Sequence, residues 1–119
     1  MPKRSPSIEN PRLPGLEGGV ISPLRAEWRR LVEVDLPKEA KMRGWPVTED
    51  HCFARILLDN AAKRPWRDVI KPPAWRNASE SILMRATSLG AACLKGTEDL
   101  HMLNRRSLEM RGKANLSGG

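Results

Sequence analysis

The sequence predicts an all-α protein: a small bundle of three to four helices with an extended, largely disordered N-terminal arm. Apolar residues recur at spacings of three and four in several segments that are bounded by capping residues and prolines. No segment of strand length alternates apolar and polar residues between hairpin turns, which disfavours a sheet. The 119 residues suffice for one small domain.

The composition divides the chain into three parts. Residues 1–45 are expected to form a flexible arm rich in proline and glycine, because residues 1–21 hold four of the ten prolines and few apolar side chains. The bundle is expected over residues 46–113, and residues 114–119 form a flexible tail.

One short helix is predicted in the arm, over about residues 22–34. Ser22 is a suitable N-cap, and leucine, tryptophan and valine fall on one face of this helix. Pro37 is expected to end it, since proline lacks an amide donor and clashes with the preceding turn. Residues 37–46 then form a connector whose Trp45 docks on the bundle.

Three helices are predicted in the bundle itself. Asn77 is expected to cap the middle one, because Glu80 follows it at the spacing of a capping box, and Gly96 is expected to end it. The predicted ranges are 48 to 63 or 64, 77–95 and 97–110, with a short helical turn over 66–70. The predicted core residues are Phe53, Ile56, Leu83, Leu89 and Leu103.

The charge suggests an acidic partner. The chain has 21 Lys or Arg and 14 Asp or Glu, a formal charge of +7, and Arg outnumbers Lys by 14 to 7. Arginine makes forked contacts with phosphate, so DNA or RNA is the first candidate, and a merely solvated helix surface is the alternative. A tight turn at 94–97 would present the last helix to a major groove. The candidate nucleic-acid-binding residues are Arg64, Arg67, Lys71, Arg76, Asn104, Arg105, Arg106 and Arg111.

The competing function is docking on a larger enzyme. Trp66 and Trp75 flank a proline corner, and tryptophan is a frequent anchor of protein interfaces.

A set of polar residues in the bundle has two interpretations, interhelical hydrogen bonding or a ligand pocket. These residues are Asp59, Asn60, Asn104 and Ser107.

Catalysis is disfavoured, and no catalytic residue, cofactor or metal site is assigned. His51 and Cys52 are helix neighbours that point about 100° apart, and Cys93 and His101 are separated by a helix break, so tetrahedral metal geometry is not preset. Both cysteines are expected in the core of a reduced, cytoplasmic protein. No apolar run is long enough for a membrane span, and no secretory signal is expected. The oligomeric state stays open.

Part of the bundle resembles a known family. The chain reads DHCFARILLDN over residues 50–60, has Pro65-Trp66 and Pro73-Ala74 in its middle, and reads LNRRSLEMR over residues 103–111. It is similar in these segments, roughly half its length, to short uncharacterised bacterial proteins with a DHCFxRIxLDN opening and an LNxxSLxxR helix. Some members have names such as acetyltransferase or methyltransferase without a matching domain. The resemblance implies a small helical module and no particular reaction, which leaves a fragment-like transferase as a distant third function.

Overall fold

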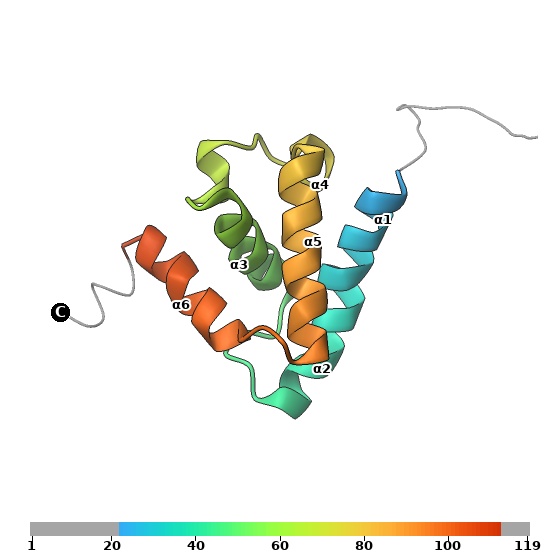
Figure 1. The fold of residues 1–119 in the computed structure, drawn as a ribbon, viewed down its shortest axis with the longest axis vertical. Helices are drawn as coiled ribbons and strands as arrows, with labels where there is room; N and C mark the ends of the chain where they lie inside the picture. Colours follow the sequence, from blue (N-terminus) through green and yellow to red (C-terminus); the bar gives the residue numbers. More distant parts are fainter. Residues whose placement is uncertain (1–21, 113–119) are drawn as a thin grey trace, which may run out of the picture.

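The structure, a computed structural model, describes residues 22–112 (Figure 1). Within this range the chain forms helices and loops with no strand, which confirms the predicted all-α bundle. The predicted arm as far as residue 21, the last predicted bundle residue 113 and the predicted tail 114–119 lie outside the described residues. The elements are α1 (Pro23–Arg30), η1 (Leu31–Asp35), α2 (Leu36–Arg43), α3 (Asp50–Ala62), η2 (Trp66–Asp68), α4 (Ala74–Asn77), α5 (Glu80–Lys95) and α6 (Leu100–Met110).

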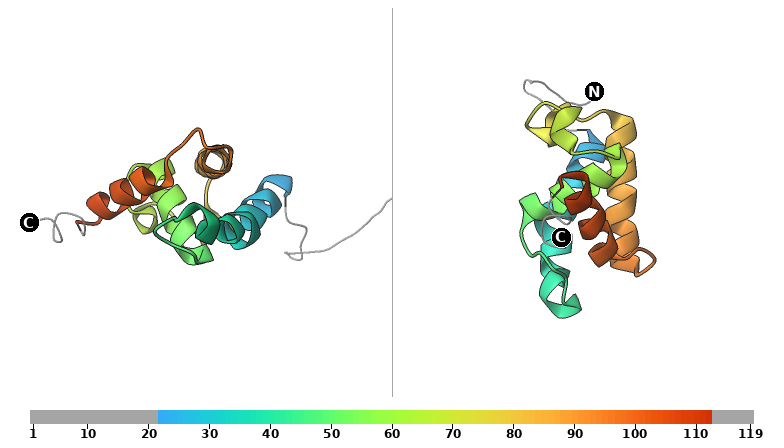
Figure 2. Two further views of the ribbon diagram at one scale, coloured as in Figure 1. Left: turned by 90° about the horizontal axis from the view of Figure 1, so that it is seen from below. Right: turned by 90° about the vertical axis from the view of Figure 1, so that its left-hand side faces the viewer.

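Helix α3 lies at the centre of the bundle. It contacts α5 and α6, and the helix formed by α1, η1 and α2 packs against both α3 and α5. Viewed from below, α5 is seen end-on above the line where α3 and this N-terminal helix meet, and α6 lies on the far side of α3 (Figure 2). Four of the five predicted core residues are fully buried, whereas Leu89 is half-buried at the edge of the core.

The prediction that Pro37 ends the first helix is wrong. Residues 23–43 form one continuous helix, because η1 is a π-helical turn in which the amide of Leu36 donates to the carbonyl of Leu31. This wider turn gives room for the ring of Pro37 and needs no amide from it. Trp28 and Leu36 of this helix are buried in the common core. Residues 23–43 therefore belong to the bundle, which does not begin at residue 46 as predicted.

Three helix starts also differ from prediction. Helix α3 begins at Asp50 rather than at residue 48, with Glu49 at its N-cap position. Asn77 ends the short helix α4, and Ser79 is the N-cap of α5, with its hydroxyl accepting from the amide of Ile82. Helix α6 begins at Leu100 rather than at residue 97, with Asp99 as its cap. The predicted end of α5 at Gly96 is confirmed by a φ of 85°, a conformation that glycine adopts without strain.

Gly90 marks the closest approach between α5 and the N-terminal helix. A Cβ atom at this position would collide with Leu31 Cδ2 and lie 3.0 Å from Leu57 Cδ1. A larger residue at this position would require Leu31 to shift, so glycine suits the observed spacing of these three elements.

Gly90→Ala is expected to destabilise the protein by a net amount of about 1 kcal/mol. Overpacking a filled core costs about 1–3 kcal/mol, and the better helix propensity of alanine offsets about 1 kcal/mol. Urea unfolding measures the difference. Ser88→Ala, on the exposed side of the same helix, is the control and should change stability by less than about 0.5 kcal/mol. An equal effect of the two changes would contradict the close approach at Gly90.

Candidate functional site

A buried carboxylate ties α3 to the end of α6. Asp59 is fully buried, and the guanidinium of Arg111 donates to both of its oxygens, at 2.7 Å from Nε and 3.0 Å from Nη2. The Ser107 hydroxyl donates to Oδ2 at 2.7 Å, and the amide of Trp66 donates to Oδ1 at 2.8 Å. Four charge-assisted hydrogen bonds therefore satisfy Asp59 and join three elements at one point.

The neighbouring polar residues extend this network. Arg55 donates to Ser107 Oγ and to Asn104 Oδ1, each at 2.9 Å. Asn60 donates from Nδ2 to the carbonyls of Ile56 and Leu103, at 2.7 and 2.9 Å. All four members of the polar set identified in the sequence thus take part in hydrogen bonds between α3 and α6, which supports the structural interpretation of that set.

Several arginines have structural roles that the sequence did not reveal. Arg25 donates to the carbonyls of Trp75 and Ala78, and Arg43 donates to that of Cys93. Arg85 donates to the carbonyl of Ala61 at 2.8 Å. Each of these contacts joins residues at least 24 positions apart. These contacts partly explain why the chain has more arginine than lysine. That excess was the only sign of such structural roles in the sequence.

Two of the predicted nucleic-acid-binding residues are used inside the molecule. Arg111 is 23% exposed in its side chain, and its hydrogen bond with Asp59 raises the pKa of the guanidinium above its ordinary value. Asn104 is half-buried and accepts from Arg55. Both side chains therefore already have hydrogen-bond partners within the fold.

Four of the predicted cations lie on the segment between α3 and α5. We call residues 64–77 the basic connector; it crosses one end of the bundle, at the top of Figure 1. Its cations are all exposed, and its one carboxylate, Asp68, stands 4.0 Å from the Nε of Arg64 in a solvent-exposed pair. The cations of the basic connector are Arg64, Arg67, Lys71 and Arg76.

The other two predicted cations, Arg105 and Arg106, are exposed on α6. Among residues 22–112, neither takes part in a side-chain hydrogen bond or ion pair that the structure shows.

Trp66 and Trp75 are half-buried and pack against the core. Arg67 lies over the ring of Trp66 at 5.0 Å, and Arg76 and Arg29 lie over that of Trp75 at 5.3 and 4.8 Å. Both rings also line a cleft of about 190 Å³ that reaches Trp28. The structure thus brings the two tryptophans together, but arginine side chains already lie over both rings.

The cysteines and histidines do not assemble into a site. Burial raises the pKa of the Cys93 thiol to about 11, and Glu98 and Asp99 add to this rise, so the thiol stays protonated at neutral pH. Cys52 is half-buried and His51 is exposed on the next position of α3. Within residues 22–112, no group of three or more histidine, cysteine or acidic side chains is arranged to hold a metal ion.

The fold and these surfaces define a small all-α protein with an internal polar network and an exposed basic connector. No helix among the described residues is long and apolar enough to cross a membrane. Comparisons of the chain with protein-family models, with curated proteins and with solved structures found no match.

Proposed function

We propose that the protein is a non-catalytic helical module that binds a polyanion, namely DNA or RNA, through the basic connector. The observation that supports this most directly is the contrast between two groups of arginines. Those that contact Asp59 or backbone carbonyls are held within the fold, whereas four cations of the connector stay exposed beside a single acid. Such a set suits a nucleic-acid backbone, which presents a regular row of negative charges.

The tryptophans strengthen this proposal. Arg67 and Arg76 lie over the rings of Trp66 and Trp75, so each guanidinium has one face supported by an indole. A stacked guanidinium loses less conformational freedom when it grips a phosphate than a fully mobile one does. The arrangement favours phosphate contacts over base-specific reading, because Asn104, the residue suited to a base edge, is engaged by Arg55.

The test is a titration of the full chain against labelled single-stranded RNA and duplex DNA, followed by fluorescence anisotropy. Affinity should fall steeply between about 50 and 200 mM salt, because each phosphate contact contributes about 0.9 on duplex DNA, and about 0.7 on a single strand, to the slope of log affinity against log salt. In the variant R64E/R67E/K71E we expect more than a tenfold loss of affinity at low salt, and a slope that is smaller by about 3 on duplex DNA and by about 2 on single-stranded RNA.

A matched control separates a local surface from net charge. Lys38 and Lys41 belong to α2 and Lys95 is the last residue of α5, and α2 and this end of α5 lie at the opposite end of the bundle from the connector (Figure 1). All three side chains are exposed, and K38E/K41E/K95E changes the charge by the same amount. This variant should bind much more tightly than the connector variant. Equal losses in both, or no binding at low salt, would refute the connector as the binding surface. R105E/R106E then tells whether α6 contributes to it.

Docking of a protein partner on Trp66 and Trp75 is the second candidate function, favoured by the cleft that these rings line with Trp28. A partner held there would stay bound at high salt and would be lost on Trp75→Ala. Binding that is abolished by moderate salt supports the first function instead.

A further inference from the structure

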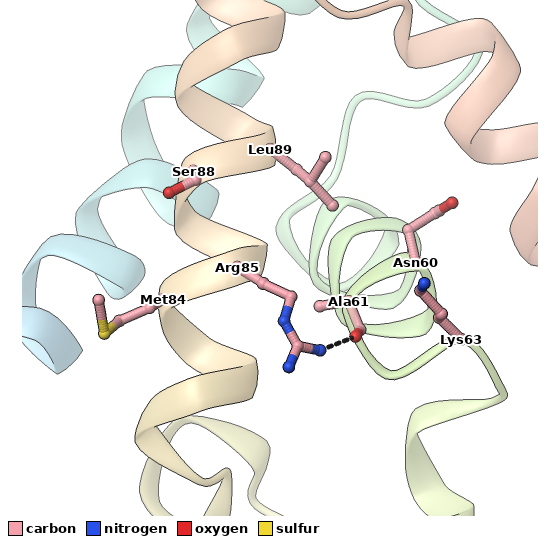
Figure 3. Close-up of a pocket in the computed structure, with 7 residues that line it drawn as sticks. All are labelled: Asn60, Ala61, Lys63, Met84, Arg85, Ser88 and Leu89. Atoms are coloured by element: carbon pink, nitrogen blue, oxygen red, sulfur yellow. Dashed lines mark hydrogen bonds between the residues drawn. The ribbon is translucent and has the colours of Figure 1, made fainter.

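A groove between α3 and α5 is larger than the cleft beside the tryptophans (Figure 3). Its volume is about 500 Å³, within the range of small-molecule sites. Arg85 and Leu89 point from α5 toward α3, whereas Met84 points away from α3 (Figure 3). Ala61 and Leu89 supply the apolar surface between the two helices, and Met84, at the outer edge of the groove, is 58% exposed. The lining residues are Asn60, Ala61, Lys63, Met84, Arg85, Ser88 and Leu89.

The groove has cations on both walls and no carboxylate among its lining residues. Lys63 follows α3 and Arg85 belongs to α5. The guanidinium of Arg85 is held by hydrogen bonds from Nη1 to the carbonyl of Ala61, at 2.8 Å, and from Nη2 to Ser81 Oγ, at 3.1 Å. A guanidinium has five N–H donors, so this fixed group retains donors for an anion.

The backbone at Lys63 is a second, independent observation. Lys63 has a φ of 63°, and it is the only residue other than glycine with a positive φ within residues 22–112. The helices that end at Gly44 and Gly96 use glycine for the same left-handed conformation. A lysine is strained there, and a strained residue that places a cation beside a groove suggests selection for the side chain rather than for stability.

We propose that this groove binds an aliphatic monocarboxylate. The alkyl chain lies against Ala61 and Leu89, and the carboxylate is held at the rim that carries Lys63 and Arg85. Charge complementarity selects this occupant, because an apolar surface bordered by two cations and no acid suits an apolar molecule with one negative end. The proposal is independent of nucleic-acid binding, since neither cation belongs to the basic connector.

The first measurement is isothermal titration of the full chain with octanoate, decanoate and dodecanoate below their micelle concentrations. Each added methylene that is buried should tighten binding by up to about fourfold, until the groove is filled. Dodecylamine has the same chain with the opposite charge and is expected to bind at least tenfold more weakly than dodecanoate. Equal affinities for the amine and the carboxylate, or no dependence on chain length, would overturn the proposal.

The variants separate binding from folding. Lys63→Gly removes the cation and relieves the backbone, so we expect at least tenfold weaker binding of decanoate with an unchanged or higher midpoint of thermal unfolding. Arg85→Gln should also weaken binding, whereas Lys95→Gln, an exposed cation of α5 outside the groove, should not. Wild-type affinity in both groove variants would overturn the proposal. A dimer that forms without carboxylate and is lost in Lys63→Gly would assign the groove to a second copy of the chain and would also overturn it.

Discussion

Replacing Asp59 by alanine is expected to lower the free energy of unfolding by about 3–5 kcal/mol, the range found when one partner of a buried ion pair is removed. The change leaves the guanidinium of Arg111 without its acceptor and removes the partner of the Ser107 hydroxyl and of the Trp66 amide. The loss is large because Asp59 is fully buried, so no water molecule from the solvent readily replaces it as the acceptor for these donors. Chemical denaturation followed by circular dichroism measures it.

An exposed pair supplies the control for Asp59. Asp68 and Arg64 are each more than half exposed and 4.0 Å apart, so Asp68→Ala should change stability by less than about 1 kcal/mol. A double-mutant cycle of Asp59→Ala and Arg111→Ala should show a coupling energy of about 1–3 kcal/mol. Similar effects of Asp59→Ala and Asp68→Ala would mean that the network does not hold α6 in place.

Trp28→Ala is expected to destabilise the protein by about 3–5 kcal/mol, as for other large side chains truncated in a core. Trp28 is 2% exposed and lies on the N-terminal helix, which packs against α3 and α5. Because typical domains are stable by about 5–15 kcal/mol, the loss would be a large fraction of the total stability. Equilibrium unfolding in urea tests it.

Val34→Ala on the same helix is the matched control, since Val34 is 51% exposed, and it should shift stability by no more than about 0.5 kcal/mol. If Trp28→Ala costs less than about 1 kcal/mol, the N-terminal helix is not part of the cooperatively folded core. The segment would then behave as the separate arm that the proline content of the sequence suggests.

Local patterns were sufficient to predict the bundle, because helix periodicity and helix ends depend on residues close together in the chain. Gly96 was predicted correctly as the end of α5 because a glycine directly after a segment of helical periodicity is typical of a helix C-terminus. Asn77 was misassigned because two good capping residues, Asn77 and Ser79, stand two positions apart, and only the short helix α4 decides between them.

The polar network shows where sequence reasoning fails. Asp59 and Arg111 are 52 positions apart, and nothing in the pattern of one chain distinguishes Arg111 from the exposed Arg105 and Arg106. The charge of the chain predicted a basic surface, but it did not tell which arginines would be held inside. The groove between α3 and α5 was missed for the same reason, since its walls come from separate helices and the backbone of Lys63 gives no compositional signal.

The π-helical turn before Pro37 keeps the buried residues of the N-terminal helix on one side of it. Four of the five buried residues of this helix follow one another in steps of four: Trp28, Val32, Leu36 and Ala40. In a regular α-helix, residues four positions apart are rotated about the axis by about 40° relative to one another. A π-helical turn has more residues per turn, so it reduces this rotation where it occurs. The turn therefore acts as an insertion of one residue. If the exposed Val34 were absent, the spacings between these four buried residues would be four, three and four. Such spacings are those of a heptad repeat, which keeps apolar residues on one face of a helix without a wider turn.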